Sequence, residues 1–142
     1  MSHPIIADTG GLLRALARKG GKPSFPPYQA ALTSASLVVV PALVLAEVDY
    51  FLRKERAAMR RLIAEIFDPA TRYEYELPIA SDVARAIELD AKFKELNLGL
   101  VDAMVAAVAE RRRIHRVLTT DRRDFAALRI GPRLSVALEL LP

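Results

Sequence analysis

What the sequence lacks already excludes several kinds of protein. Its 142 residues contain no cysteine, so disulfide bonds, thiolate metal sites and a cysteine nucleophile are all excluded. The only histidines are His3 and His115, and we expect both to be structural or exposed. No G-x-G-x-x-G, Walker A or G-x-S-x-G sequence is present, which argues against dinucleotide binding, P-loop phosphate binding and serine-hydrolase chemistry.

The sequence also has no long apolar run and no export signal. Its longest apolar stretch runs from Leu37 to Ala46, contains Pro41 and ends at Glu47, well short of the roughly 20 residues that a membrane span needs. The first residues do not show a basic region followed by an apolar one. We therefore expect a soluble, cytoplasmic protein with no membrane partner.

The composition is typical of a folded protein. Apolar residues make up 52% and charged residues 27% of the chain. There is no linker, internal repeat or low-complexity tract, so a single domain spanning residues 1–142 is predicted. With 21 Lys and Arg against 17 Asp and Glu, the formal net charge is +4, which is compatible with a polyanionic partner but does not identify one.

Strand and helix patterns alternate along the chain. Buried strands are predicted over 5–7, 37–40 and 116–119, an edge strand over 73–77 and a last strand over 134–138. Helices are predicted over 12–17, 28–34, 41–54, 56–67, 83–93, 100–112 and 123–128, with a loop over 22–27, a cap at Ser81 or Asp82 and a helix stop over 97–99. This alternation predicts an α/β fold of three α/β/α layers with a mostly parallel central sheet.

Four acids lie within or directly after apolar segments: Asp8, Glu47, Asp102 and Asp121. Burying a bare carboxylate is prohibitive, so each acid must lie at the end of an element, pair with a cation or bind metal. Asp8 and Asp121 follow predicted strands, and ligands of open α/β sheets bind beyond the carboxyl ends of the strands. The pattern therefore predicts one site shared by the four acids.

Oxygen ligands without cysteine select a hard cation, for which Mg²⁺ is the default and Mn²⁺ a close substitute. Such an ion lowers the pKa of bound water and neutralises charge during displacement at a phosphodiester. The hydroxyl groups of Thr9, Thr119 and Thr120 are suited to orient a carboxylate or a metal-bound water.

Each acid also has a purely structural interpretation. Asp8 is a good helix cap, and Asp102 in a first helical turn is favoured by the helix dipole. Glu47 could be an exposed helix residue paired with a cation, and Asp121 a turn residue beside two arginines. The proposed partners are Arg53 or Lys54 for Glu47, and Arg122 and Arg123 for Asp121.

Taken in order, these motifs resemble the PIN domain and, more narrowly, the VapC-type ribonuclease toxins of prokaryotic toxin–antitoxin pairs. The matching segments are Asp8-Thr9, Glu47, Leu98-Gly99-Leu100-Val101-Asp102-Ala103 and Leu118-Thr119-Thr120-Asp121-Arg122-Arg123-Asp124-Phe125. The resemblance implies a small α/β endoribonuclease that depends on Mg²⁺ or Mn²⁺ and is often a homodimer. It also implies a cognate antitoxin whose C-terminal segment wraps the toxin and reaches its acidic pocket.

By motif position, the resemblance carries over Asp8, Glu47, Asp102 and Asp121 as the catalytic, metal-binding acids. Thr119 carries over as the threonine two positions before the last acid, whereas Asp124 matches a more variable position of the family. Because a negative site needs nearby cations to bind RNA, Lys22, Arg122 and Arg123 are candidate phosphate contacts.

Two other functions compete with this one. A haloacid-dehalogenase-type phosphatase needs a second Asp two residues after the first, where this chain has Gly10. A non-toxin PIN-like protein for RNA processing or RNA binding, with little or no catalysis, is the main alternative. Retention of all four acids argues against a pure binding role. Phe25, Tyr28 and Tyr50 could stack on bases, although packing roles are the more common use of such residues.

Overall fold

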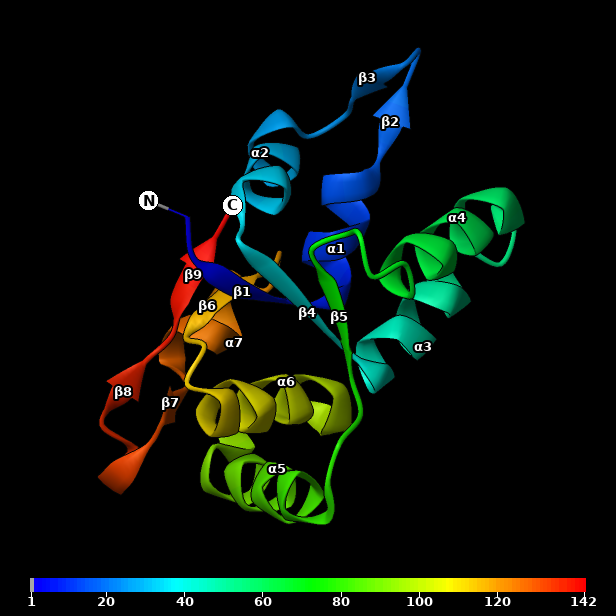
Figure 1. The fold of residues 1–142 in the computed structure, drawn as a ribbon. Coiled ribbons are helices and arrows are strands. Elements are labelled where there is room, and N and C mark those ends of the chain that lie inside the picture. Colours follow the sequence, from blue (N-terminus) through cyan, green and yellow to red (C-terminus); the bar gives the residue numbers. More distant parts are fainter. Residues whose placement is uncertain (1) are drawn as a thin grey trace.

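The computed structural model describes residues 2–142 (Figure 1). Its central sheet contains β1 (Pro4–Ala7), β4 (Leu37–Pro41), β5 (Tyr73–Glu76), β6 (Arg116–Leu118) and β9 (Glu139–Leu141), in the order β5-β4-β1-β6-β9. Every pair of neighbours in this sheet is parallel. The predicted parallel sheet is confirmed, and β5 lies at its edge as expected.

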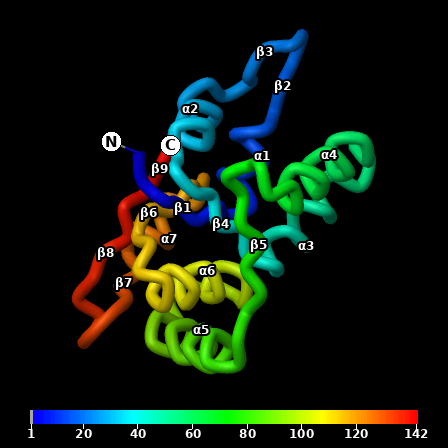
Figure 2. The backbone as a smooth tube through the Cα atoms, viewed as in Figure 1, coloured from blue at the N-terminus to red at the C-terminus, as the bar shows by residue number. Residues whose placement is uncertain are grey.

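The helices are α1 (Thr9–Leu16), α2 (Pro26–Ser34), α3 (Ala42–Phe51), α4 (Arg56–Ile66), α5 (Ala80–Lys92), α6 (Gly99–Arg112) and α7 (Arg122–Ala127). Figures 1 and 2 show α1 and α2 on one side of the sheet, and α6 backed by α5 on the other. Helices α3 and α4 extend outward from the end of β4. The three-layer α/β/α arrangement is therefore confirmed.

The core is centred on β4 and α6. Val39 and Val40 are fully buried, as a β-branched strand covered on both faces should be. Residues 103–109 of α6 are all buried, because this helix lies between the sheet and α5. Alanine occupies four of these seven positions, and its small side chain lets the layers approach closely. None of the helices between residues 2 and 142 has both the length and the apolar character that crossing a bilayer requires.

Charged contacts join α5 to α6. Asp82 is only 2% exposed, and it accepts hydrogen bonds from Arg111 Nε at 2.8 Å and from the Ile79 N–H at 3.1 Å. Burial raises the pKa of Asp82, but these hydrogen bonds outweigh burial and hold the pKa below its usual value. The helix begins at Ala80, so Asp82 caps it from inside the first turn, and Ser81 is not the cap.

The predicted loop over 22–27 is partly wrong. Lys22–Pro23 forms β3, which pairs antiparallel with β2 (Arg18–Lys19). Gly20 and Gly21 make the turn between them with φ of 59° and 75°, which a residue with a Cβ rarely adopts. This hairpin projects from the body beyond the C-terminal end of α1 (Figures 1 and 2).

The predicted last strand over 134–138 is also wrong. Leu134 ends the 3-10 helix η2 (Pro132–Leu134), and Val136–Ala137 forms β8. Strand β8 pairs antiparallel with β7 (Arg129–Ile130), and the strand that joins the central sheet is β9. Gly131, with φ of 77°, begins the reversal that takes the chain out of the sheet layer.

The remaining boundaries differ by a few residues. Pro41 is the last residue of β4 and lies just before α3, whereas the sequence predicted it inside the helix. The predicted stop before α6 is confirmed: the 3-10 helix η1 (Lys94–Leu96) ends at Leu96 and is followed by Asn97, which has φ of 52°.

Candidate active site

The carboxyl ends of β4, β1 and β6 lie side by side, because these strands are adjacent and parallel. Asp8 directly follows β1, and Asp121 follows β6 at the start of α7. Glu47 lies on α3, which begins where β4 ends. Asp102 is in the first turn of α6, which packs against both α3 and β4. The topology therefore directs all four acids toward the same edge of the sheet.

The electrostatics show that these acids face one another. Burial and then the charges of Asp8, Asp121, Glu47 and Asp124 raise the pKa of Asp102 to about 7. The pKa of Asp8 is also raised, mainly by burial and further by Glu47 and Asp121, while a hydrogen bond from Thr119 opposes the shift. The charges of Asp8, Glu47 and Asp121 therefore act on Asp102, and Asp124 also contributes.

Asp8 occupies the position before α1, yet its side chain does not cap the helix. It is only 5% exposed, and its Oδ2 accepts a hydrogen bond of 2.8 Å from Thr119 Oγ1. Its other oxygen, Oδ1, is buried and has no hydrogen-bond partner in the structure. A buried carboxylate oxygen without a donor is costly, so the capping interpretation does not account for Asp8.

Thr119 links two of the acids through hydrogen bonds. Its buried hydroxyl donates to Asp8 and accepts a 2.9 Å hydrogen bond from the backbone N–H of Asp121. Asp121 in turn caps α7, since its Oδ1 accepts from the Asp124 N–H at 3.2 Å. Thr119 therefore connects the chain after β1 to the chain after β6.

The other two candidate threonines differ in their surroundings. Thr9 directly follows Asp8 and is buried. Its hydroxyl oxygen has no hydrogen-bond partner in the structure. Thr120 is half-buried and packs against Gly10.

Two glycines let α1 approach β6, a contact that the sequence analysis missed. A Cβ on Gly11 would lie 2.1 Å from the carbonyl oxygen of Leu118, and one on Gly10 would lie 2.1 Å from Thr120 Oγ1. Only glycine fits at such a close approach. The Gly-Gly pair directly after Asp8-Thr9 was the available signal for this contact.

Glu47 does not make the ion pair that its structural interpretation required. Among residues 2–142, no ion pair joins it to Arg53 or Lys54, and the nearby ion pair is between Asp49 of α3 and Arg56 of α4 at 2.8 Å. Glu47 is half-buried and its charge acts on Asp102 and Asp8.

The candidate RNA contacts are divided between two places. Arg122 and Arg123 are exposed in the first turn of α7, directly after Asp121. Burial and Asp121 raise the pKa of Asp124, and the positive charge of Arg123 opposes that shift. Lys22 lies on the projecting hairpin at the opposite end of α1 from Asp8, so the structure does not bring it to the acids (Figure 1).

The residues fit a hard divalent cation in their chemistry. The donors are carboxylate and hydroxyl oxygens, and the buried Asp8 Oδ1 lacks any other partner. Within the described part of the chain, no three acidic or histidine side chains converge closely enough to hold an ion as they stand. Burial and then the charges of the neighbouring acids raise the pKa of Asp102, an effect that a bound cation would oppose.

Comparisons with known proteins agree with this architecture. The model of the PIN domain matches residues 5–130. Ribonuclease VapC26 of Mycobacterium tuberculosis is 31% identical over 103 residues, which cover 68% of this chain and 72% of that protein.

Two solved structures are similar in fold. VapC20 of Mycobacterium tuberculosis, described as a Sarcin-Ricin loop cleaving toxin, superposes with a TM-score of 0.68 and 24% identity, covering 87% of this chain and 94% of VapC20. FitAcB from Neisseria gonorrhoeae superposes with a TM-score of 0.63 and 20% identity, covering 97% of this chain and 96% of the FitAcB chain.

Proposed function

Because the chain belongs to the PIN domain family, we propose that it is an endoribonuclease that uses Mg²⁺, or Mn²⁺ as a substitute, at the four-acid site. The observation that carries this proposal is the position of four acids at one edge of the sheet, around a buried Asp8 whose Oδ1 has no hydrogen-bond partner. A cluster of this kind is costly to a protein that has no cation to place there. The relation to a relative named as a ribonuclease supports RNA as the substrate.

The chain's own residues have distinct roles in this proposal. Asp8, Glu47, Asp102 and Asp121 would hold the cation, which would give the buried Asp8 Oδ1 the partner that it lacks. Thr119 fixes the position of Asp8 relative to Asp121 through its two hydrogen bonds. When bound, the ion supplies a water of lowered pKa and neutralises charge at the phosphodiester. Arg122 and Arg123, which are exposed directly after Asp121, would contact phosphates.

The proposal extends to a toxin–antitoxin role. We propose a cognate antitoxin as partner, in line with the similarity to ribonuclease VapC26, and a homodimer as the working assembly. Two groups of large apolar side chains are exposed and available for such contacts. The first group lies on α3 and α4 and consists of Tyr50, Phe51, Ile63 and, directly after α4, Phe67. The second group lies on α5 and just before it, and consists of Leu77, Ile79, Val83 and Ile87.

Mapping of RNA ends tests the proposal. Purified protein is incubated with total cellular RNA in Mg²⁺, in Mn²⁺ and in EDTA, beside the Asp102→Asn variant. Asp49→Asn is the matched control, because Asp49 lies on the same helix as Glu47 but forms an exposed ion pair with Arg56. We expect discrete new ends only with metal, from the unmodified protein and from the control.

Two results would contradict the proposal. Cleavage that survives EDTA would rule out a metal-dependent mechanism, and equal cleavage by Asp102→Asn would rule out this site. RNA binding without cleavage under any metal would instead favour the alternative of a PIN-like binding protein.

A further inference from the structure

A cation and two aromatic rings gather where α1 meets the start of α2. Arg14 Cζ lies 4.8 Å from the ring centre of Phe25 and 5.5 Å from that of Tyr28. The two rings are 6.4 Å apart and nearly perpendicular, at 83°. We call these three residues the Arg14 cluster. Neither the four-acid site nor the fold requires a cation at this position.

Arg14 lies in the last turn of α1, and the Arg14 cluster is connected to the residues around the four acids through Tyr28. The Tyr28 hydroxyl donates to the carbonyl oxygen of Thr119 at 3.3 Å. The side chain of the same Thr119 donates to Asp8. One residue therefore contacts both the Arg14 cluster and the acids.

Arg14 differs from the arginines of α5 and α6 in the groups that contact its guanidinium. Arg85, Arg111 and Arg112 are each held by carboxylates, as their ion pairs show. Within residues 2–142, no ion pair or side-chain hydrogen bond to a protein acceptor is found for Arg14, which is exposed. Aromatic rings position its guanidinium, so its N–H donors remain available to a planar, anionic acceptor such as phosphate.

Phe25 and Tyr28 differ in their exposure. Tyr28 is 8% exposed and is accounted for by packing, whereas Phe25 is 39% exposed. An exposed ring beside a positioned arginine is the combination by which proteins bind single-stranded nucleic acid, with bases stacked on rings and phosphates near cations. The acids themselves repel phosphates, so the affinity for RNA must come from groups beside the pocket.

We propose that Arg14 and Phe25 form a nucleotide-binding subsite for single-stranded RNA whose neighbouring nucleotides extend toward the four-acid site. The Arg14 guanidinium binds a phosphate, and the exposed ring of Phe25 stacks on a base. Tyr28 supports both residues and joins the subsite to Thr119. This inference rests on the proposed function, because RNA is the substrate named there.

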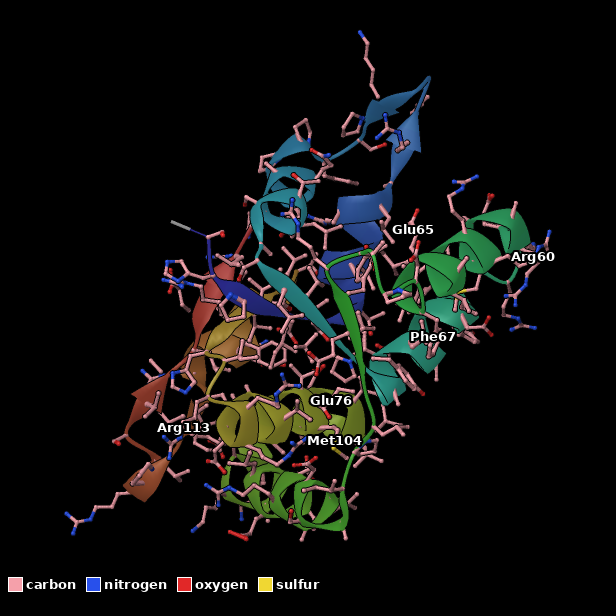
Figure 3. All side chains as sticks on the ribbon, in the orientation of Figure 1. Arg60, Glu65, Phe67, Glu76, Met104 and Arg113 are labelled. Carbon is pink, nitrogen blue, oxygen red and sulfur yellow. The ribbon has the colours of Figure 1, made fainter. Side chains whose placement is uncertain are left out.

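Binding without cleavage provides the test. All variants are made in the Asp102→Asn chain, and a fluorescent RNA of about 12 nucleotides with randomised sequence is titrated by anisotropy over a series of salt concentrations. Arg60→Gln is the matched control. Arg60 is an exposed helical arginine on α4, and Figure 3 shows it at the outer side of the molecule, away from the sheet.

The two substitutions should have different signatures. Arg14→Gln should reduce the slope of log affinity against log salt by about 0.7, the share of one phosphate contact on a single strand. Phe25→Leu should weaken binding by about tenfold without changing that slope, because stacking is not ionic. Arg14→Lys should keep the slope, since it keeps the charge. Thermal unfolding of each variant confirms that it is folded.

The subsite is refuted if Arg14→Gln and Phe25→Leu both bind RNA with the same affinity and the same salt dependence as Arg60→Gln. It is also refuted if none of these variants binds RNA. Cleavage by the chain with Asp102 intact is scored separately. Cleavage with no binding difference overturns the subsite alone, and a binding difference with no cleavage overturns the proposed function alone.

Discussion

Replacing Asp102 by asparagine should stabilise the metal-free protein while it abolishes metal-dependent cleavage. The ordinary pKa of an aspartate is 3.8, and burial with the neighbouring acids raises that of Asp102 to about 7 in the folded chain. The folded state therefore holds this proton more tightly than the unfolded state does. Between these two values, stability must fall as the pH rises.

The size of the effect follows from the same pKa. A difference of about 3 pH units at about 1.4 kcal/mol per unit gives an upper bound of about 4 kcal/mol lost once Asp102 is fully ionised. Asp102 is partly exposed, and solvent screens the repulsion, so we expect about 2 kcal/mol. Asparagine keeps the shape of the side chain without the charge and should recover this amount.

Urea unfolding in EDTA at about pH 5 and about pH 8 measures the effect. The advantage of Asp102→Asn over the unmodified protein should grow by about 1–2 kcal/mol between the two conditions. Asp49→Asn, on an exposed ion pair, should show no such growth. An advantage of the same size at both pH values, or none at either, would refute the electrostatic account. Added Mg²⁺ should stabilise the unmodified protein and not the variant.

Three further substitutions test the framework of the site. Gly11→Ala would place a Cβ 2.1 Å from the Leu118 carbonyl oxygen, so thermal unfolding should show a loss of about 2 kcal/mol or more; an unchanged melting temperature would mean that α1 does not pack this closely. Thr119→Val removes both hydrogen bonds of the hydroxyl, and we expect a loss of about 1–3 kcal/mol in urea together with reduced cleavage, whereas full activity would show that Thr119 does not position the acids. Arg111→Met leaves Asp82 buried without its ion-pair partner and should cost about 3 kcal/mol in urea, an effect that should disappear when Asp82 is also replaced by asparagine.

Much of this architecture could be predicted from local sequence. The β-branched run Leu37–Val40 and the apolar α6 are identifiable because their patterns do not depend on distant partners. The placement of Asp8 and Asp121 at the same edge of the sheet could be predicted, because adjacent parallel strands have their carboxyl ends there.

The rest depends on contacts that the sequence pattern does not encode. The Tyr28–Thr119 hydrogen bond joins residues 91 positions apart, and nothing near either residue indicates the other. The C-terminal strands were misplaced because Leu134, Val136 and Leu138 alternate like a strand, while the backbone turn after Gly131 decides which residues reach β6. Lys22 was chosen for its charge alone, and the direction of the β2–β3 hairpin places it away from the acids.

The most direct test of the account is a Mn²⁺ titration of the full chain, with free Mn²⁺ followed by electron paramagnetic resonance. The account predicts saturable binding that is weakened by Asp8→Asn and by Asp102→Asn but not by Asp49→Asn. Binding that is the same in all four proteins, or absent from the unmodified chain, would contradict the claim that these carboxylates form one cation site.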